Sequence, residues 1–163
     1  MLRRWWVAAT ITVFIFLSVA VAVGEVSAVA VRLSSGQTVY VPIYSHIYSG
    51  DRERPVLLTA TLSIRNTDPR HQITITVVDY YDSNGRLIKH FLDQPLQLTG
   101  MASTRFVIGE SDKSGGSGAN FIVKWTAQGK IVPPIIEAVM ISTKMQQGIS
   151  FISRGQVVQE TGK

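Results

Sequence analysis

The sequence predicts an all-β fold, an immunoglobulin-like antiparallel β-sandwich preceded by an N-terminal apolar helix. From Gln37 onward, short runs rich in Val, Ile, Thr, Tyr and Phe are separated by Gly, Pro, Asn, Asp and Ser, which is the pattern of strands and turns. No segment after Arg32 has a helical period. Seven to nine short strands without helices between them are typical of a sandwich of roughly 130 residues.

Composition supports an ordered globular domain and excludes several classes of function. Of the 163 residues, 45% are hydrophobic and 17% are charged, and such a chain can bury a core. The formal net charge is +5, but the basic residues are scattered singly, so we expect no nucleic-acid partner. The sequence contains no cysteine, which excludes disulfides, thiolate metal sites and a cysteine nucleophile.

The N-terminus has the features of an export segment. Arg3 and Arg4 are followed by residues 5–23, which carry no charge and are long enough as a helix to cross a hydrocarbon core of about 30 Å. Small residues at Ala28 and Ala30 also fit signal-peptidase sites, so residues 1–30 are either a cleaved signal peptide or a retained membrane anchor. A buried core helix is disfavoured because the segment has no polar face.

Both outcomes send the rest of the chain across the membrane, because the positive-inside bias keeps the basic start in the cytoplasm. We expect an extracytoplasmic protein, periplasmic or on the outer face of the cytoplasmic membrane, secreted or membrane-anchored. If residues 5–23 are not cleaved, they bind the cytoplasmic membrane. A linker is expected over residues 31–38, the sandwich over residues 39–155 and a C-terminal tail over residues 156–163.

The expected strands follow from apolar runs and alternation. Residues 57–65 alternate apolar and polar side chains, which indicates a strand with one buried and one wet face. Pro42 lacks an amide hydrogen, so the first strand is expected at an edge or a bulge. Trp125 lies mid-strand and suits a core position. The expected strands are residues 39–43, 57–65, 73–81, 86–91, 96–98, 104–108, 119–126, 137–142 and 149–154.

The pair Asn84-Gly85 predicts a tight turn. Asn and Gly tolerate the positive φ angles of a type I′ turn, so we expect residues 73–81 and 86–91 to form an antiparallel hairpin. Asp82 stands at the start of this turn, where such a carboxylate more often accepts hydrogen bonds from backbone amides than transfers protons.

Five runs of sequence carry a resemblance to a known family. They are VPIYSHIY at residues 41–48, SIRNTDP at 63–69, VDYYD at 78–82, SGGSGANF at 114–121 and EAVMI at 137–141. Together and in this order they resemble the bacterial "domain of unknown function 3124" family over residues 39–155. The resemblance implies an exported bacterial protein. The family has no assigned activity and supplies no catalytic residue.

The Gly-rich segment at residues 113–120 does not match a phosphate-binding motif. A P-loop ends in Gly-Lys-Ser/Thr before a helix, whereas here Lys113 and Ser114 come first and a strand is expected afterwards. A dinucleotide fingerprint lacks its third glycine here, and a nucleophile elbow lacks its last glycine and its helix. Two interpretations stay open: a flexible or bulged loop between strands, and a nest of backbone amides for an anion or a carboxylate.

Aromatic side chains recur with even spacing near the first strand. If residues 39–48 stay extended, the rings of this segment share one face, which suits a sugar, peptide or aromatic ligand. Pro42 interrupts this register, and the alternative is a sheet edge covered by packed tyrosines. We expect a ligand site between this segment and the Gly-rich loop. Its candidate residues are Tyr44, His46, Tyr48, Asp112, Ser114, Gly116, Ser117 and Asn120.

No catalytic, metal-ligating or cofactor-binding set is predicted. The three histidines, His46, His71 and His90, are not spaced for shared ligation, and Asp79 and Asp82 do not define a glycosidase site. We expect a non-enzymatic module that binds an unknown ligand or protein at the bacterial envelope. Two alternatives stay open: an envelope hydrolase with an unassigned site, and a structural or stress-protective sandwich.

Overall fold

The computed structural model describes residues 31–143 and 148–161, and these residues contain twelve strands and no helix. The strands are β1 (Ser34–Pro42), β2 (His46–Ser49), β3 (Arg54–Leu57), β4 (Thr59–Arg65), β5 (Ile73–Tyr81), β6 (Leu87–His90), β7 (Leu96–Leu98), β8 (Ser103–Ile108), β9 (Asn120–Ile131), β10 (Ile135–Ser142), β11 (Ile149–Arg154) and β12 (Gln156–Glu160). Within these ranges no helix is long and apolar enough to cross a membrane. The N-terminal helix, residues 5–23 and the cleavage sites of the sequence prediction lie outside the described residues.

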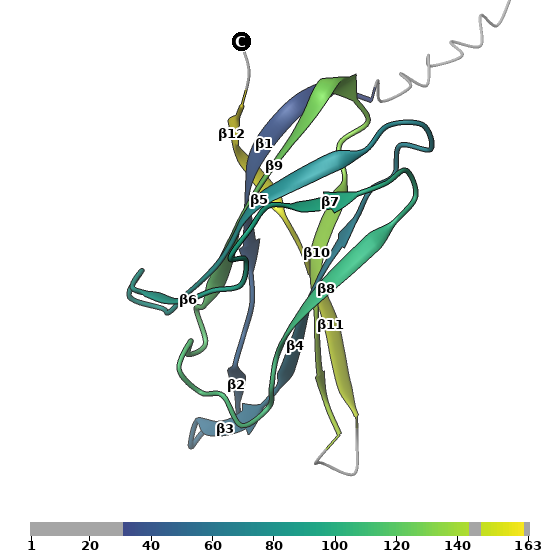
Figure 1. Cartoon of the computed structure of the whole chain (residues 1–163). Coiled ribbons are helices and arrows are strands. Elements are labelled where there is room, and N and C mark those ends of the chain that lie inside the picture. Colours follow the sequence, from purple (N-terminus) through teal and green to yellow (C-terminus); the bar gives the residue numbers. More distant parts are fainter. Residues whose placement is uncertain (1–30, 144–147, 162–163) are drawn as a thin grey trace, which may run out of the picture. The chain divides into compact units, whose positions relative to one another are not determined.

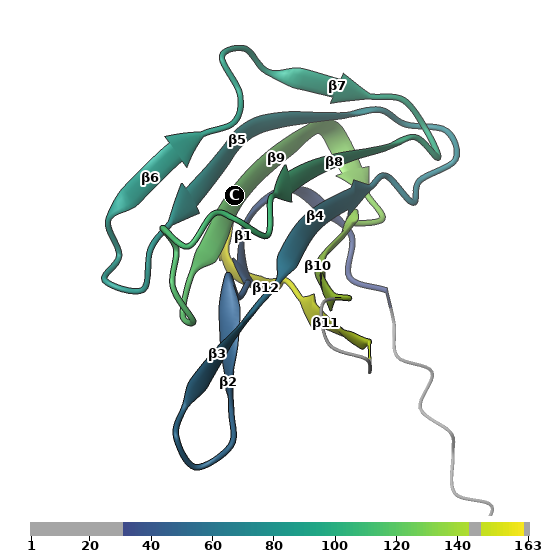
Figure 2. The same cartoon turned by 90° about the horizontal axis from the view of Figure 1, so that it is seen from below.

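Antiparallel pairing organises the strands into two large sheets and one hairpin (Figure 1). The first sheet has the order β12-β1-β9-β5-β6, and β7 also pairs with β5. The second sheet has the order β11-β10-β4-β8. β2 and β3 pair with each other, and Figure 2 shows their hairpin projecting away from the two large sheets. The prediction of an all-β antiparallel fold is confirmed.

The two large sheets share one hydrophobic core. Side chains alternate along each strand, so β4 buries Ala60, Leu62 and Ile64 and leaves the intervening residues more exposed. Phe121 and Trp125 of β9 belong to the same cluster and are fully buried, which confirms the core position predicted for Trp125. Full burial of a large apolar side chain contributes about 1.5–3 kcal/mol relative to exposure, so this cluster stabilises the fold.

The structure corrects both ends of the predicted sandwich. β1 begins at Ser34, so the expected linker at residues 31–38 is partly strand, and the expected tail at residues 156–163 contains β12. These two segments pair antiparallel with each other. Their polar sequences concealed the pairing, because apolar alternation is the main signal for a strand. β9 also continues to Ile131, beyond its predicted end at residue 126.

Gly155 lets the chain cross from one sheet to the other. β11 lies at the edge of the second sheet, β12 lies at the edge of the first, and Gly155 joins them. Its amide donates to the carbonyl of Ile136 at 2.8 Å. A Cβ at this position would lie 2.6 Å from Cγ1 of Val39 and 2.8 Å from the Ile136 oxygen. The crossing therefore requires a residue without a side chain.

The β5–β6 hairpin forms as predicted, but its turn is of another type. A type I′ turn needs positive φ at both central residues. Of Asn84 and Gly85, only Gly85 has it, at 77°. Asp82 organises a longer loop instead, because its Oδ1 accepts hydrogen bonds from the amides of Asn84 and Arg86, both at 2.9 Å. The capping role predicted for Asp82 is confirmed.

Candidate functional site

The structure places the predicted aromatic segment beside the Gly-rich loop. After β1 ends at Pro42, the amide of Ile43 donates to the carbonyl of Ala119 at 2.9 Å. The amide of Ser45 then donates to the carbonyl of Gly116 at 3.0 Å. These bonds bring together two segments that are far apart in the sequence, and they do so through residues outside the predicted aromatic set.

Several polar groups of the Gly-rich loop bond to each other and to Ser83. The amide and the Oγ of Ser83 each donate to the carbonyl of Gly115 at 2.9 Å, and the same Oγ accepts from the amide of Gly118 at 2.9 Å. Asp112 accepts from the amide of Ser114 at 2.9 Å and from its hydroxyl at 2.5 Å. Because these groups are already paired within the protein, their hydrogen bonds stabilise the conformation of the loop between β8 and β9.

Glycine at position 115 allows the loop to cover the ring of Tyr80. The Tyr80 hydroxyl lies 3.2 Å from the Oγ of Ser45, and both residues are fully buried. A Cβ on Gly115 would overlap the Tyr80 hydroxyl. Burial raises the pKa of the Tyr80 phenol, so the hydroxyl stays neutral and keeps its proton for hydrogen bonding. Gly115 therefore lets the loop backbone pack closely against a core tyrosine.

The aromatic side chains do not form the single face that the even spacing predicted. Tyr44 packs edge-on against Phe151 of β11, with ring centroids 5.6 Å apart. His46 and Tyr48 lie on β2, where their rings meet edge to face and His46 Nε2 lies 3.1 Å from the Tyr48 hydroxyl. The prediction of one face is wrong because a bend at Ser45 interrupts the extended chain and separates Tyr44 from β2.

The remaining candidate residues are distributed along the loop. Gly116 has a φ of 78°, which favours glycine. Ser117 is half-buried, and Asn120 begins β9 opposite Pro42 of β1 and Tyr81 of β5. Of the candidates, His46 and Tyr48 thus lie on the β2–β3 hairpin, Tyr44 packs against β11, and the others lie in the Gly-rich loop or at its end.

A cavity of about 740 Å³ opens beside the β2–β3 hairpin. A volume of this size accommodates a small ligand. Its walls come from the hairpin, from the chain just after β8 and from the end of β10, and they combine apolar with charged side chains. The lining residues are Ser49, Gly50, Asp51, Arg52, Arg54, Pro55, Val56, Leu57, Glu110 and Ser142.

Ser142 brings a buried hydroxyl to the wall of this cavity. The residue is 3% exposed, and its Oγ has no hydrogen-bond partner among residues 31–143 and 148–161. A buried hydroxyl without a partner costs about 1–3 kcal/mol. A polar ligand atom would offset this cost only after the Ser142 side chain rotates, because its Oγ is not accessible from the cavity.

The sequence prediction missed the cavity. One signal was present, because residues 51–54 alternate acidic and basic side chains between two short strands. Such a run is usually a solvated loop tip and does not by itself mark a site. Glu110 and Ser142 are distant in sequence, and only the pairing of β4 with β8 and β10 brings them to the same end of the second sheet.

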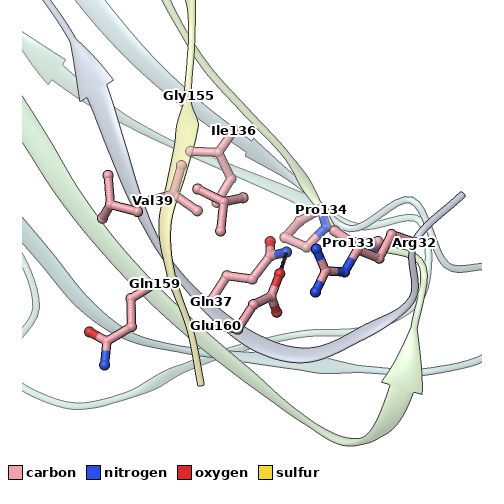
Figure 3. Close-up of a pocket in the computed structure, with 11 residues that line it drawn as sticks. Arg32, Gln37, Val39, Pro133, Pro134, Ile136, Gly155, Gln159 and Glu160 are labelled. Carbon is pink, nitrogen blue, oxygen red and sulfur yellow. Dashed lines mark hydrogen bonds between the residues drawn. The ribbon is translucent and has the colours of Figure 1, made fainter. Parts of the chain in front are cut away.

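A second cavity, of about 520 Å³, lies along β12 (Figure 3). Its carboxylate is Glu160, which accepts hydrogen bonds from the Oγ of Ser34 at 2.6 Å and the Nε2 of Gln37 at 3.0 Å. These two donors, together with the charge of Arg32, lower the pKa of Glu160. Because each carboxylate oxygen bonds to a residue of β1, we infer that Glu160 stabilises the pairing of β12 with β1.

Two histidines pair with aspartates. His71 Nδ1 lies 3.0 Å from Asp68, and His90 Nδ1 lies 2.8 Å from Asp79. The amide of Arg70, together with the amide and ring of His71, lowers the pKa of Asp68 to about 2. In the described part of the chain, no group of three or more His, Cys, Asp or Glu side chains is placed to hold a metal ion.

The fold and cavities define an all-β antiparallel protein with a ligand-sized hollow beside a projecting hairpin. The sequence matches the family described as protein of unknown function (DUF3124) over residues 36–158, and the chain belongs to this family. The resemblance carried by the five sequence runs is thereby confirmed. No curated protein is significantly similar to the chain. The crystal structure of Thermotoga maritima 1070 is similar with a TM-score of 0.46 and 9% sequence identity, over 77% of this chain and 97% of that chain.

Proposed function

We propose that this protein is an extracytoplasmic, non-enzymatic binding module whose ligand occupies the cavity beside the β2–β3 hairpin. The observation that carries the proposal is a hollow of about 740 Å³ with an apolar wall, charged side chains and a buried hydroxyl. Ligand sites are typically concave, largely apolar and supplied with a few polar groups that orient the ligand. In the Gly-rich loop, by contrast, the carbonyl of Gly115, the amide of Gly118 and the carboxylate of Asp112 already take part in hydrogen bonds within the protein.

The lining favours a short peptide as the ligand. Val56 and Leu57 offer an apolar wall for a side chain, while Asp51 and Arg54 carry opposite charges. A peptide combines apolar side chains with amide groups and with termini of both charges. The hydroxyl of Ser142 is able to donate to a peptide carbonyl or accept from a peptide amide.

The proposed location outside the cytoplasm rests on the N-terminal sequence. A basic start precedes the uncharged residues 5–23, and this order directs the following chain across the membrane. Residues 1–30 are proposed to be a signal peptide or a membrane anchor. A binding module at the envelope would then present its cavity to ligands outside the cytoplasm.

The two sheets are further proposed to be an immunoglobulin-like sandwich with exchanged strands. In immunoglobulin domains the last two strands pair within one sheet. In this chain the last two strands, β11 and β12, lie in different sheets, because β11 pairs with β10 and β12 pairs with β1. The shared core supports the sandwich, and the exchange distinguishes its connectivity from that of an immunoglobulin domain.

Tripeptides with a central Leu or Phe are the probe for this function. We expect saturation-transfer NMR on the full chain to detect binding with a Kd below about 1 mM. The substitution Leu57→Trp adds bulk to the half-buried cavity wall and should weaken binding about tenfold. Leu87→Trp is the matched control, because Leu87 is 38% exposed on β6 and outside the cavity lining. Absence of transfer to the unmodified protein, or equal weakening by both variants, would overturn the proposal.

A further inference from the structure

The outer face of the β11-β10-β4-β8 sheet carries a largely apolar row that crosses all four strands, with three apolar side chains and one threonine. The register places Ile152, Val139, Thr61 and Val107 opposite one another, from β11 to β8. This row points away from the core, because the neighbouring residues of β4 are buried. Ile152 is 58% exposed and Val107 is 47% exposed.

Ile141 extends this surface along β10, and Ile135 lies on the other side of Glu137 on the same strand. Ile135 and Ile141 lie on the outer face, since the alternate residues of β10 are buried. They are 49% and 43% exposed. An exposed patch of contiguous apolar side chains, rimmed by polar residues, is typical of a surface that binds a partner.

Arginine side chains border the apolar row. In the adjacent row of the sheet, Arg154 lies opposite Glu137, Glu137 opposite Ser63, and Ser63 opposite Arg105. Arg65 occupies the next outward position of β4. Glu137 is the one acidic residue among the outward positions of these four strands, so the face has an excess of positive charge.

A groove of about 420 Å³ on this face is lined by Arg65, Ile135, Glu137 and Arg154. Nε of Arg65 donates to the Oγ of Ser63 at 3.2 Å. None of the ion pairs found in the described residues involves either arginine of the groove. A guanidinium group has a planar set of donors that matches a carboxylate in a bidentate geometry.

We infer that this face docks a partner protein whose Asp or Glu side chains reach Arg65, Arg105 and Arg154 while its apolar side chains cover the row from Ile152 to Val107. Charge complementarity identifies the partner surface as acidic. A second copy of the same face would instead bring the arginine-rich rows against each other, which is unfavourable.

The residue types on the face favour a protein over a lipid surface. None of the outward residues of β4, β8, β10 and β11 is a lysine or an aromatic residue. Protein interfaces are enriched in Arg and depleted in Lys. Surfaces that bind lipid headgroups typically insert Trp, Phe or Leu side chains, which this face lacks.

Site-specific photo-crosslinking of the full chain in its host organism tests the inference. Benzoylphenylalanine at Thr61 reports on the face, and the same residue at Thr126 is the matched control, because Thr126 is half-buried like Thr61 and faces outward on β9 of the other sheet. We expect a protein adduct at Thr61 about fivefold or more above that at Thr126, with Asp or Glu in the crosslinked peptide. The charge reversals Arg105→Glu and Arg154→Glu together should lower its yield about fivefold, whereas Lys124→Glu should not.

The alternative occupants give distinct adducts. An adduct with lipid alone would assign the face to a membrane surface, and an adduct with another copy of this chain would assign it to self-association. Both results would overturn the inference. Equal yields at Thr61 and Thr126, no protein adduct, or a yield that does not depend on Arg105 and Arg154 would overturn it as well.

Discussion

The amide of Ser45 donates a hydrogen bond to the carbonyl of Gly116 at 3.0 Å. This bond ties the chain between β1 and β2 to the loop between β8 and β9, and the hydroxyl of Ser45 meets that of Tyr80 beneath the same loop. The glycines of the loop therefore belong to a packed structure. We expect substitutions in the loop to change stability, and substitutions in the hairpin cavity to change binding.

Replacing Gly115 by alanine tests the packing of the loop. We expect Gly115→Ala to lower the free energy of unfolding by about 1–3 kcal/mol, because the added Cβ would overlap the Tyr80 hydroxyl. Gly109→Ala is the control, since nothing lies within 4 Å of a Cβ at that position. Urea titration compares the two variants, and equal stabilities would contradict the packing role.

Gly155, where the chain passes from one sheet to the other, is also expected not to tolerate a side chain. Gly155→Ala would press a Cβ against Val39 and the backbone of Ile136, so we expect a loss of about 1–3 kcal/mol in unfolding free energy. Gly129→Ala in β9 has open space around its Cβ and should change stability little. If thermal unfolding shows the same midpoint for both variants, Gly155 is not the constraint we describe.

Backbone conformation predicts the effect of substitutions at Gly85. Its φ of 77° resists a β-branched residue, so Gly85→Val should cost about 1 kcal/mol or more. Gly85→Asn should cost less, because Asn tolerates this conformation. Chemical denaturation measures both, and an equal cost for Val and Asn would contradict a conformational cause.

The strands with apolar alternation could be predicted from sequence, whereas the polar strands could not. β4 alternates Ala60, Leu62 and Ile64 with polar residues, and this pattern is local. The pairing of β12 with the start of β1 is accompanied by hydrogen bonds from Ser34 and Gln37 to Glu160. Because the bonded residues are far apart in the chain, the sequence around each of them shows no pattern that predicts the pairing.

The candidate site could be predicted only in part for the same reason. Composition indicated that the segment with Tyr44 to Tyr48 and the Gly-rich loop belong together, and the Ser45–Gly116 bond joins them. The hairpin cavity needs residues from three separate parts of the chain, and Glu110 and Ser142 carry no motif. Residue type also did not reveal that the loop's polar groups would bond to Ser83.

Acid should destabilise the fold through Asp68. The amide of Arg70, together with His71, lowers the pKa of Asp68 to about 2 from the value of 3.8 that applies to the unfolded chain. The stability that this carboxylate provides is complete above pH 3.8 and is lost as the pH falls through about 2. We expect Asp68→Asn to flatten the dependence of unfolding free energy on pH in this window. If the unfolding free energies of the variant and the unmodified protein change in parallel with pH, Asp68 is not a cause of the acid destabilisation.

Reporter fusions test the proposed export. Alkaline phosphatase fused after Lys163 should be active, and β-galactosidase fused at the same position should be inactive, because the basic start and residues 5–23 direct the chain outward. The mass of the mature N-terminus then distinguishes a cleaved signal peptide from a retained anchor. Full β-galactosidase activity would contradict export.

Binding of a short peptide beside the β2–β3 hairpin is tested most directly by mapping backbone chemical shifts of the full chain during titration with a Leu-centred tripeptide. We predict saturable shifts at residues 49–57, Glu110 and Ser142, which line the cavity. Shifts centred on residues 112–120, or no saturable shifts anywhere, would contradict the assignment of the cavity as the binding site.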